Sequence, residues 1–152
     1  MALPDAAYRF IGWFSTTRFD RVLHPWLYRI AGGRGILGRP LGGEVILLTA
    51  PGRRTGRLRT VALFGFRDER GWVVIASRGG SNAIPAWYRN LAAASTAKVR
   101  SGSTEVDVRA VELDGDDYER AFEVSAATYP GYRVYRKNAP YRIPIVRLEP
   151  VR

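Results

Sequence analysis

The chain has no cysteine, one methionine and one histidine among its 152 residues. The lack of cysteine excludes disulfide bonds, thiolate metal sites and cysteine nucleophiles. The single histidine, His24, precedes Pro25 in an apolar context, so we expect it to pack inside the protein and not to serve a Ser-His-Asp triad. No apolar run approaches the roughly 18 residues that a membrane-spanning helix needs, and Asp5 and Arg9 interrupt the start in a way untypical of a secretory signal. We therefore expect a cytoplasmic protein.

Acidic residues are scarce as well. The 14 aspartates and glutamates are outnumbered by 24 lysines and arginines, which gives a net charge of +10 and a pI of about 10.6. Such an excess indicates an anionic partner: a nucleic acid, a membrane surface or an anionic small molecule. The hydrophobic fraction of 46% is ordinary for a globular protein, so it adds no further restriction.

The N-terminal part, residues 1–43, differs from the remainder. Residues 4–31 show helical periodicity and carry arginines among aromatic side chains, and residues 32–43 form a glycine-rich connector. A basic, aromatic-rich helix of this kind can bind an anionic membrane surface, here at the inner face of the cell membrane, or it can pack on the rest of the protein. The pattern does not decide between these two roles.

Residues 44–152 predict a small antiparallel β-barrel with flanking helices. We expect strands at 45–49, 60–67, 72–77, 98–101, 104–113 and 143–149, because apolar runs there are separated by short turns. Helices are expected at 85–94 and from 114 or 116 to 128. Pro144 lacks an N–H group, so the last strand should lie at a sheet edge or begin at that residue.

The turn between the first two strands is crowded with Arg53, Arg54, Arg57 and Arg59. Four cations in so short a segment repel one another unless an anion bridges them, and guanidinium groups favour bidentate contact with phosphate and carboxylate. The glycines of this turn would let backbone N–H groups approach that anion. The alternative is a solvated hairpin tip. The segment is not a P-loop, because no Gly-Lys-Ser/Thr follows.

Three segments, in order, resemble the deazaflavin-dependent nitroreductase family, whose members are also described as F-420-dependent quinone reductases. They are residues 48–56 (LTAPGRRTG) with Arg59, residues 76–80 (ASRGG) with 85–90 (PAWYRN), and residues 129–132 (YPGY) with 143–150 (IPIVRLEP). The resemblance implies a split β-barrel of the flavin-reductase (FMN-binding-like) type. It also implies coenzyme F-420, an 8-hydroxy-5-deazaflavin with a phosphate and polyglutamate tail, and hydride transfer to a quinone, nitroaromatic or activated enone.

The same resemblance assigns roles to particular residues. It places Arg53, Arg54, Thr55 and Arg59 at the phosphate and tail, Ala62, Leu63 and Phe64 beside the ring, and Ser77, Arg78 and Gly79 at the ring's polar edge. It also makes Trp87 and Asn90 cofactor-binding residues, on the helix that closes the pocket. Tyr132, Tyr135 and Ser77 are the candidate catalytic residues, and no metal is expected. The family usually has lysine at position 78, and often proline and tyrosine at 62 and 64, so this chain departs from it there.

Three other functions stay open. The same barrel could bind FMN, although the arginine-rich turn suits a longer anionic tail. A nucleic-acid-binding barrel would explain the charge, but the aromatic residues fall in expected helices and not along alternating strand faces, so we expect no nucleic acid. A protein that binds lipids or a membrane surface without redox activity would rest on the expected N-terminal helix alone.

Overall fold

The protein is described here from a computed structural model, which defines residues 43–78 and 82–152. The expected N-terminal helix, most of the glycine-rich connector and Gly79 lie outside the described residues. The domain boundary expected after residue 43 therefore stays a prediction.

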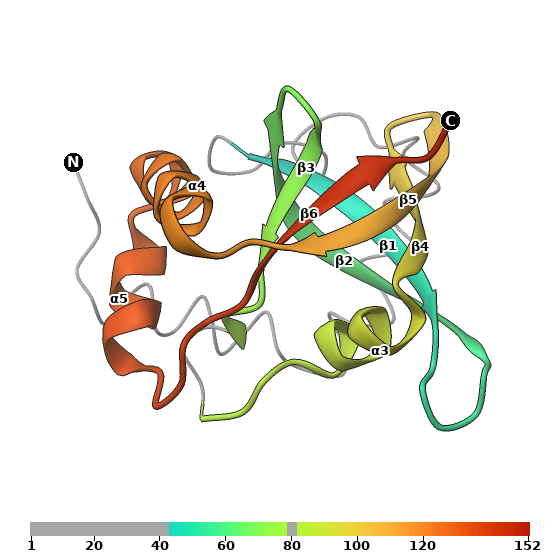
Figure 1. Cartoon of the computed structure of the whole chain (residues 1–152), viewed down its shortest axis with the longest axis horizontal. Coiled ribbons are helices and arrows are strands. Elements are labelled where there is room, and N and C mark those ends of the chain that lie inside the picture. The colour runs from blue at the N-terminus through green and yellow to red at the C-terminus, as the bar shows by residue number, and fades with distance from the viewer. Residues whose placement is uncertain (1–42, 79–81) are drawn as a thin grey trace.

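The described residues form a closed, six-stranded antiparallel barrel, as the sequence predicts, together with three helices (Figure 1). In chain order the elements are β1 (Glu44–Pro51), β2 (Leu58–Asp68), β3 (Gly71–Ile75), α3 (Ala86–Ala94), β4 (Thr96–Ser101), β5 (Thr104–Glu112), α4 (Gly115–Thr128), α5 (Gly131–Asn138) and β6 (Ile145–Pro150). The order around the barrel is β1-β2-β3-β6-β5-β4. Helix α5, which contains the candidate catalytic residues Tyr132 and Tyr135, is not among the helices expected above.

Strand β6 lies between β3 and β5, so it is not an edge strand. Pro144 immediately precedes it, and its carbonyl oxygen accepts a hydrogen bond of 2.9 Å from the N–H of Ala76. The expectation of an edge is therefore wrong, and the alternative, a proline at the start of the strand, is correct. Closure of the barrel removes every edge, and this depends on pairing between strands far apart in sequence.

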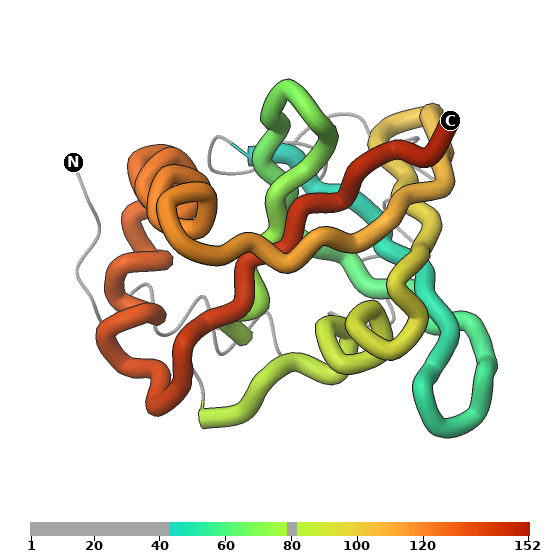
Figure 2. The backbone as a smooth tube through the Cα atoms, in the orientation of Figure 1, coloured from blue at the N-terminus to red at the C-terminus, as the bar shows by residue number. Residues whose placement is uncertain are grey.

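Alternation along the strands creates two packed layers. Ile46 and Leu48 of β1 face the barrel interior with Val74, Val99 and Leu148. A second layer lies outside the barrel, where α4 and α5 cover the sheet. Its buried residues include Tyr118, Phe122, Tyr129, Tyr132 and Tyr135. The tube view shows α4 and α5 together on one side of the barrel, away from α3 (Figure 2).

Strands β2 and β3 are paired over only a short length. Their ladder includes Asp68 with Gly71 and ends at Phe66 with Val73. Beyond this point β2 continues to pair with β1, whereas β3 continues to pair with β6. The two strands therefore separate towards the first residues of β2, which follow the arginine-rich turn. A split barrel requires such a separation.

Gly71 begins β3 at a point of close backbone approach. Its φ is +150°, and a Cβ atom at this position would lie 2.0 Å from the carbonyl oxygen of Leu148. No side chain fits at that distance, so glycine is required for β3 to lie against β6 here.

Candidate functional site

The arginine turn, defined here as residues 52–57, connects β1 to β2 at one end of the barrel. Two backbone hydrogen bonds of 2.8 Å close it, from Gly52 N–H to the carbonyl of Arg57 and from Gly56 N–H to the carbonyl of Gly52. The N–H of Arg57 also donates to Thr55 Oγ1 at 3.3 Å. The turn is therefore internally hydrogen-bonded and has a defined backbone.

These bonds correct one expectation from the sequence. The N–H groups of Gly52 and Gly56 donate within the turn, so they are not available to an anion. The N–H of Arg53 donates to Asn90 Oδ1 at 3.2 Å. These three N–H groups therefore do not serve an anion, whereas the guanidinium side chains of the turn can.

The charges of the turn are not compensated. Arg53, Arg54 and Arg57 of the turn and the adjacent Arg59 at the start of β2 are all exposed. Within residues 43–78 and 82–152, none of them forms an ion pair. Arginines elsewhere do: the Arg133 guanidinium, for example, contacts both carboxylate oxygens of Glu123 at 3.0 and 2.7 Å. The scarce carboxylates thus neutralise other arginines and leave this turn strongly positive.

The three residues expected beside the ring lie on opposite faces of β2. Ala62 and Phe64 stand opposite Leu47 and Val45 of β1 and pack with them on the outer face. Leu63 packs instead into the barrel interior. A flat ring on the outer face could meet the side chains of Ala62 and Phe64, but only the backbone of Leu63.

Ser77 and Arg78 follow β3 at the end where β2 and β3 separate. Ser77 is buried, whereas Arg78 is exposed and has a φ of +44°, a left-handed conformation that is unfavourable for a residue with a side chain. Strained residues of this kind often occur at functional sites.

Tyr141 is a neighbour of this segment that sequence reasoning missed. Its hydroxyl donates to the carbonyl of Ala83 at 3.1 Å. Burial raises the pKa of Tyr141, and the nearby charge of Arg78 partly opposes that effect. An aromatic residue ahead of the last strand gives no distinctive signal in one sequence, since its partners lie about 60 residues earlier.

The tyrosines of α5 and of the residues before it are packed together. The hydroxyl oxygens of Tyr129 and Tyr135 are 2.8 Å apart, and the ring of Tyr129 stacks beside Phe64 with centroids 6.3 Å apart. Tyr132 is only 5% exposed and meets the ring of Phe66 edge-on at 5.7 Å. The structure thus brings the tyrosine cluster against the outer face of β2, next to Phe64.

Burial has two consequences for Tyr132. It raises the pKa of this phenol well above its ordinary value, with Tyr129 adding to the effect, so the hydroxyl is protonated at neutral pH. It also means that the phenol is enclosed by its neighbours, among them the rings of Phe66, Tyr129 and Tyr135. Its catalytic role stays a prediction.

Helix α3 closes one end of the barrel. Leu91 is 1% exposed in the interior cluster, and Trp87 and Tyr88 pack against the same cluster. Asn90 points towards the arginine turn and accepts hydrogen bonds from Arg53. Among the residues expected on this helix, Asn90 therefore has a described contact with the turn, whereas Trp87 is placed mainly by packing.

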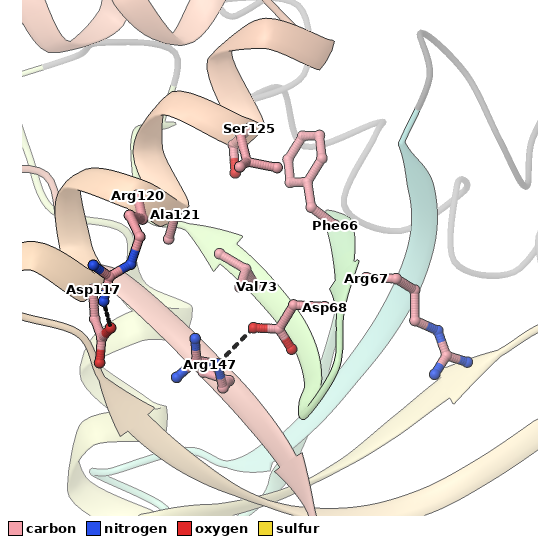
Figure 3. Close-up of a pocket in the computed structure, with 10 residues that line it drawn as sticks. Phe66, Arg67, Asp68, Val73, Asp117, Arg120, Ala121, Ser125 and Arg147 are labelled. Atoms are coloured by element: carbon pink, nitrogen blue, oxygen red, sulfur yellow. Dashed lines mark hydrogen bonds and ion pairs between the residues drawn. The ribbon is translucent and has the colours of Figure 1, made fainter.

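A pocket of about 170 Å³ lies elsewhere, between α4 and strands β2, β3 and β6 (Figure 3). Its charged residues all have partners: Arg147 Nε lies 2.7 Å from Asp68 Oδ2, Arg120 pairs with Asp117, and Arg67 pairs with Glu44 outside the pocket. None of the predicted site residues lines it. Its compensated charge and its place at the far end of β2 make it unsuited to a polyanionic tail.

Two features are absent from the described residues. Within them, no group of histidine, cysteine, aspartate or glutamate side chains is arranged to hold a metal ion. No helix among them has the length and apolar character needed to cross a membrane.

The barrel, its split between β2 and β3, and the uncompensated arginine turn define a protein of the flavin-reductase barrel class. The sequence profile of the F420H(2)-dependent quinone reductase family matches residues 21–150. The chain belongs to this family, and it is therefore an oxidoreductase whose cofactor is coenzyme F-420.

Individual relatives agree with this assignment. The F420H(2)-dependent quinone reductase Rv1261c of Mycobacterium tuberculosis is 31% identical over 131 residues, covering 83% of this chain and 87% of the relative. The solved structure of an F420-H2 dependent reductase, FDR-A, is 30% identical with a TM-score of 0.64, covering 69% of this chain and 93% of the other. A structure described as a domain-swapped dimer is 28% identical with a TM-score of 0.68, over 84% and 96% of the two chains.

The residues present suit this cofactor. A tail with a phosphate and several carboxylates needs several cations that no internal carboxylate has neutralised, and the arginine turn supplies them. Metal ligands, a thiol and a catalytic triad are not required for the chemistry of a hydride-carrying cofactor.

Proposed function

We propose that this protein reduces quinones with hydride from reduced F-420, and that nitroaromatics and activated enones are further acceptors. The observation that carries the proposal is the cluster of four exposed arginines without a carboxylate partner among the described residues. The relatives are named as quinone reductases, and the wider range of acceptors follows from the chemistry of a deazaflavin, which supplies a hydride in a two-electron step.

The protein's own residues have three tasks in this proposal. Arg53, Arg54, Thr55 and Arg59 hold the anionic tail. Ala62 and Phe64 support the ring on the outer face of β2, and Leu63 contributes through its backbone. Ser77, Arg78 and Gly79 hydrogen-bond the polar edge of the ring, and Trp87 borders it from α3.

Near the acceptor, a hydroxyl group is needed to stabilise the negative charge that develops on a quinone or nitro oxygen. Tyr132 and Tyr135 are the candidates, with Ser77 as a third. A buried phenol with a raised pKa is a protonated hydrogen-bond donor at neutral pH, which suits stabilisation of the developing charge better than ready release of a proton.

Cofactor titration tests the proposal. F-420 should bind more tightly than FMN, and Arg54→Ala should weaken F-420 binding by about 10- to 150-fold, because a charge-assisted hydrogen bond contributes roughly 1.5–3 kcal/mol. Arg133→Ala is the matched control, since it removes an exposed arginine that is already paired with Glu123. Equal affinity for F-420 and FMN, or no loss in Arg54→Ala, would contradict the assignment of the turn.

We also propose that the N-terminal helix expected at residues 4–31 contacts anionic membranes at the inner face of the cell membrane. This rests on arginines among aromatic residues in the sequence, including Arg9, Arg18 and Arg29. The full chain should co-sediment with vesicles that contain anionic lipid and not with neutral vesicles. Equal recovery with both kinds of vesicle would refute the contact.

A further inference from the structure

Asn90 makes a two-point contact with the arginine turn. Its side-chain oxygen accepts one hydrogen bond from the backbone N–H of Arg53 at 3.2 Å and another from Arg53 Nη1 at 3.0 Å. Both bonds use the same oxygen, Oδ1, and they join residues 37 positions apart in sequence. The turn is thereby fixed to a helix, in addition to its own internal bonds.

Helix α3, which carries Asn90, is itself held in place by packing and by a hydrogen bond. Leu91, the residue after Asn90, is buried in the barrel interior, and Tyr88 donates a hydrogen bond of 2.6 Å to Glu112 at the end of β5. Asn90 therefore projects from an element that is anchored on both sides of it. A turn attached to such an element cannot swing freely about the end of the β1–β2 hairpin.

We infer that Asn90 is a positioning residue, which orients the arginine turn for the anionic tail through Arg53 and does not itself bind the tail. This inference rests on the proposed function of the turn. It assigns Asn90 a role different from the direct cofactor contact that the sequence motif predicts.

The Asn90 side chain is neutral, and this matters for the charge of the arginine turn. A carboxylate at this position would hold Arg53 as well, but it would cancel one of the four positive charges by forming an ion pair. The amide oxygen holds the backbone and the guanidinium while it leaves the charge in place. The remaining N–H groups of the Arg53 guanidinium stay available to an anion.

The first test uses the free protein, so it does not depend on any cofactor. Amide hydrogen exchange at Arg53 should become faster by about 3- to 10-fold in Asn90→Ala, the equivalent of one net neutral hydrogen bond. Exchange at Arg53 should stay slow in Asn90→Asp, because that variant keeps an acceptor oxygen. Unchanged exchange in Asn90→Ala would overturn the inference, and exchange at the buried Val99 reports whether each variant is folded.

The second test separates positioning from direct binding. With F-420 as the varied substrate, Asn90→Ala should raise KM about 3- to 10-fold and leave kcat within about twofold, because the turn holds the tail and not the reacting ring. In an Arg53→Ala background the same substitution should have a smaller effect, since its partner side chain is gone. Additive losses would show that Asn90 contacts the tail directly, and would overturn the inference.

Two results keep this inference distinct from the proposed function. If the wild type binds no F-420, the proposed function fails, while the exchange measurement still decides whether Asn90 fixes the turn. Asn138→Ala, an exposed asparagine on α5, is the matched control and should change neither exchange at Arg53 nor KM.

Discussion

The phenol oxygen of Tyr88 lies 2.6 Å from Glu112 Oε2 and fastens α3 to the end of β5. Partial burial, followed by the hydrogen bond and the negative charge of Glu112, raises the pKa of Tyr88 to about 12 from 10.0. The folded protein therefore keeps this phenol protonated at a pH where the unfolded chain already releases the proton. The stability that this contact contributes is fully present below pH 10.0 and is lost as the pH rises towards 12.

We predict that Tyr88→Phe is less stable than the wild type at pH 8 by about 0.5–1.5 kcal/mol, the net value of one hydrogen bond. The difference between the two proteins should shrink as the pH rises above 10.0, because only the wild type loses the contact. Urea denaturation at several pH values measures it. A difference that stays constant up to pH 11 would show that the hydrogen bond is not the source.

Gly71→Ala should be strongly destabilising. The added Cβ would lie 2.0 Å from the carbonyl oxygen of Leu148, so β3 and β6 would have to move apart, at a cost of about 2–4 kcal/mol. Gly102→Ala is the control, since its φ is also positive but nothing lies within 4 Å of the new atom. It should cost only about 1–2 kcal/mol, from backbone strain. Equal losses in the two variants, measured by urea denaturation, would refute the steric explanation.

Most of the fold could be predicted because its signals are local. Apolar runs such as residues 45–48, separated by glycine-rich turns, mark strands whatever their partners are, and Pro85 marks the start of α3. The position of Pro144 could not be resolved in the same way. Whether its strand lies at an edge depends on pairing with β3 and β5. The residues around the proline carry no signal for either pairing.

The candidate site was less predictable, since it depends on contacts between distant residues. Four arginines in one turn indicate an anion site, but their lack of carboxylate partners becomes visible only when the ion pairs of other arginines, such as Arg147 with Asp68, are placed. The amide of Asn90 could not be matched to Arg53 by spacing. The alternation of β2, in contrast, was available in the sequence and already separates Leu63 from its two neighbours.

Tyr132→Phe should leave F-420 affinity unchanged and lower kcat/KM by about tenfold to a few hundredfold, if the hydroxyl donates to the charge that develops on the acceptor. Steady-state kinetics with menadione and a nitroaromatic, together with cofactor titration, measures both quantities. Tyr118→Phe is the matched control, because it also removes a buried hydroxyl, one that donates to the carbonyl of Ile143 at 2.7 Å. A kcat/KM equal to that of the wild type would exclude a role for the Tyr132 hydroxyl.

Arg78→Gly should lower the affinity for F-420 without lowering the free energy of unfolding. Glycine adopts the left-handed backbone of this position without strain, so the free energy of unfolding should stay the same or rise by up to about 1 kcal/mol. Affinity for F-420 should fall, because the guanidinium at the proposed polar edge of the ring is lost. Ser95→Gly, with a φ of +62° at the end of α3, is the control and should keep full affinity. Wild-type affinity in Arg78→Gly would remove Arg78 from the site.

Strand β6 is the last of the barrel strands in chain order, yet it joins β3 to β5. Among the described strands, β3 is paired only through its short ladder with β2 until β6 has been synthesised, and β5 has a free edge until then. Closure then requires a strand that pairs with residues about 70 positions earlier, at a correspondingly high entropic cost. The barrel can therefore close only after β6 has been synthesised, and until then β5 is open to pairing with other chains.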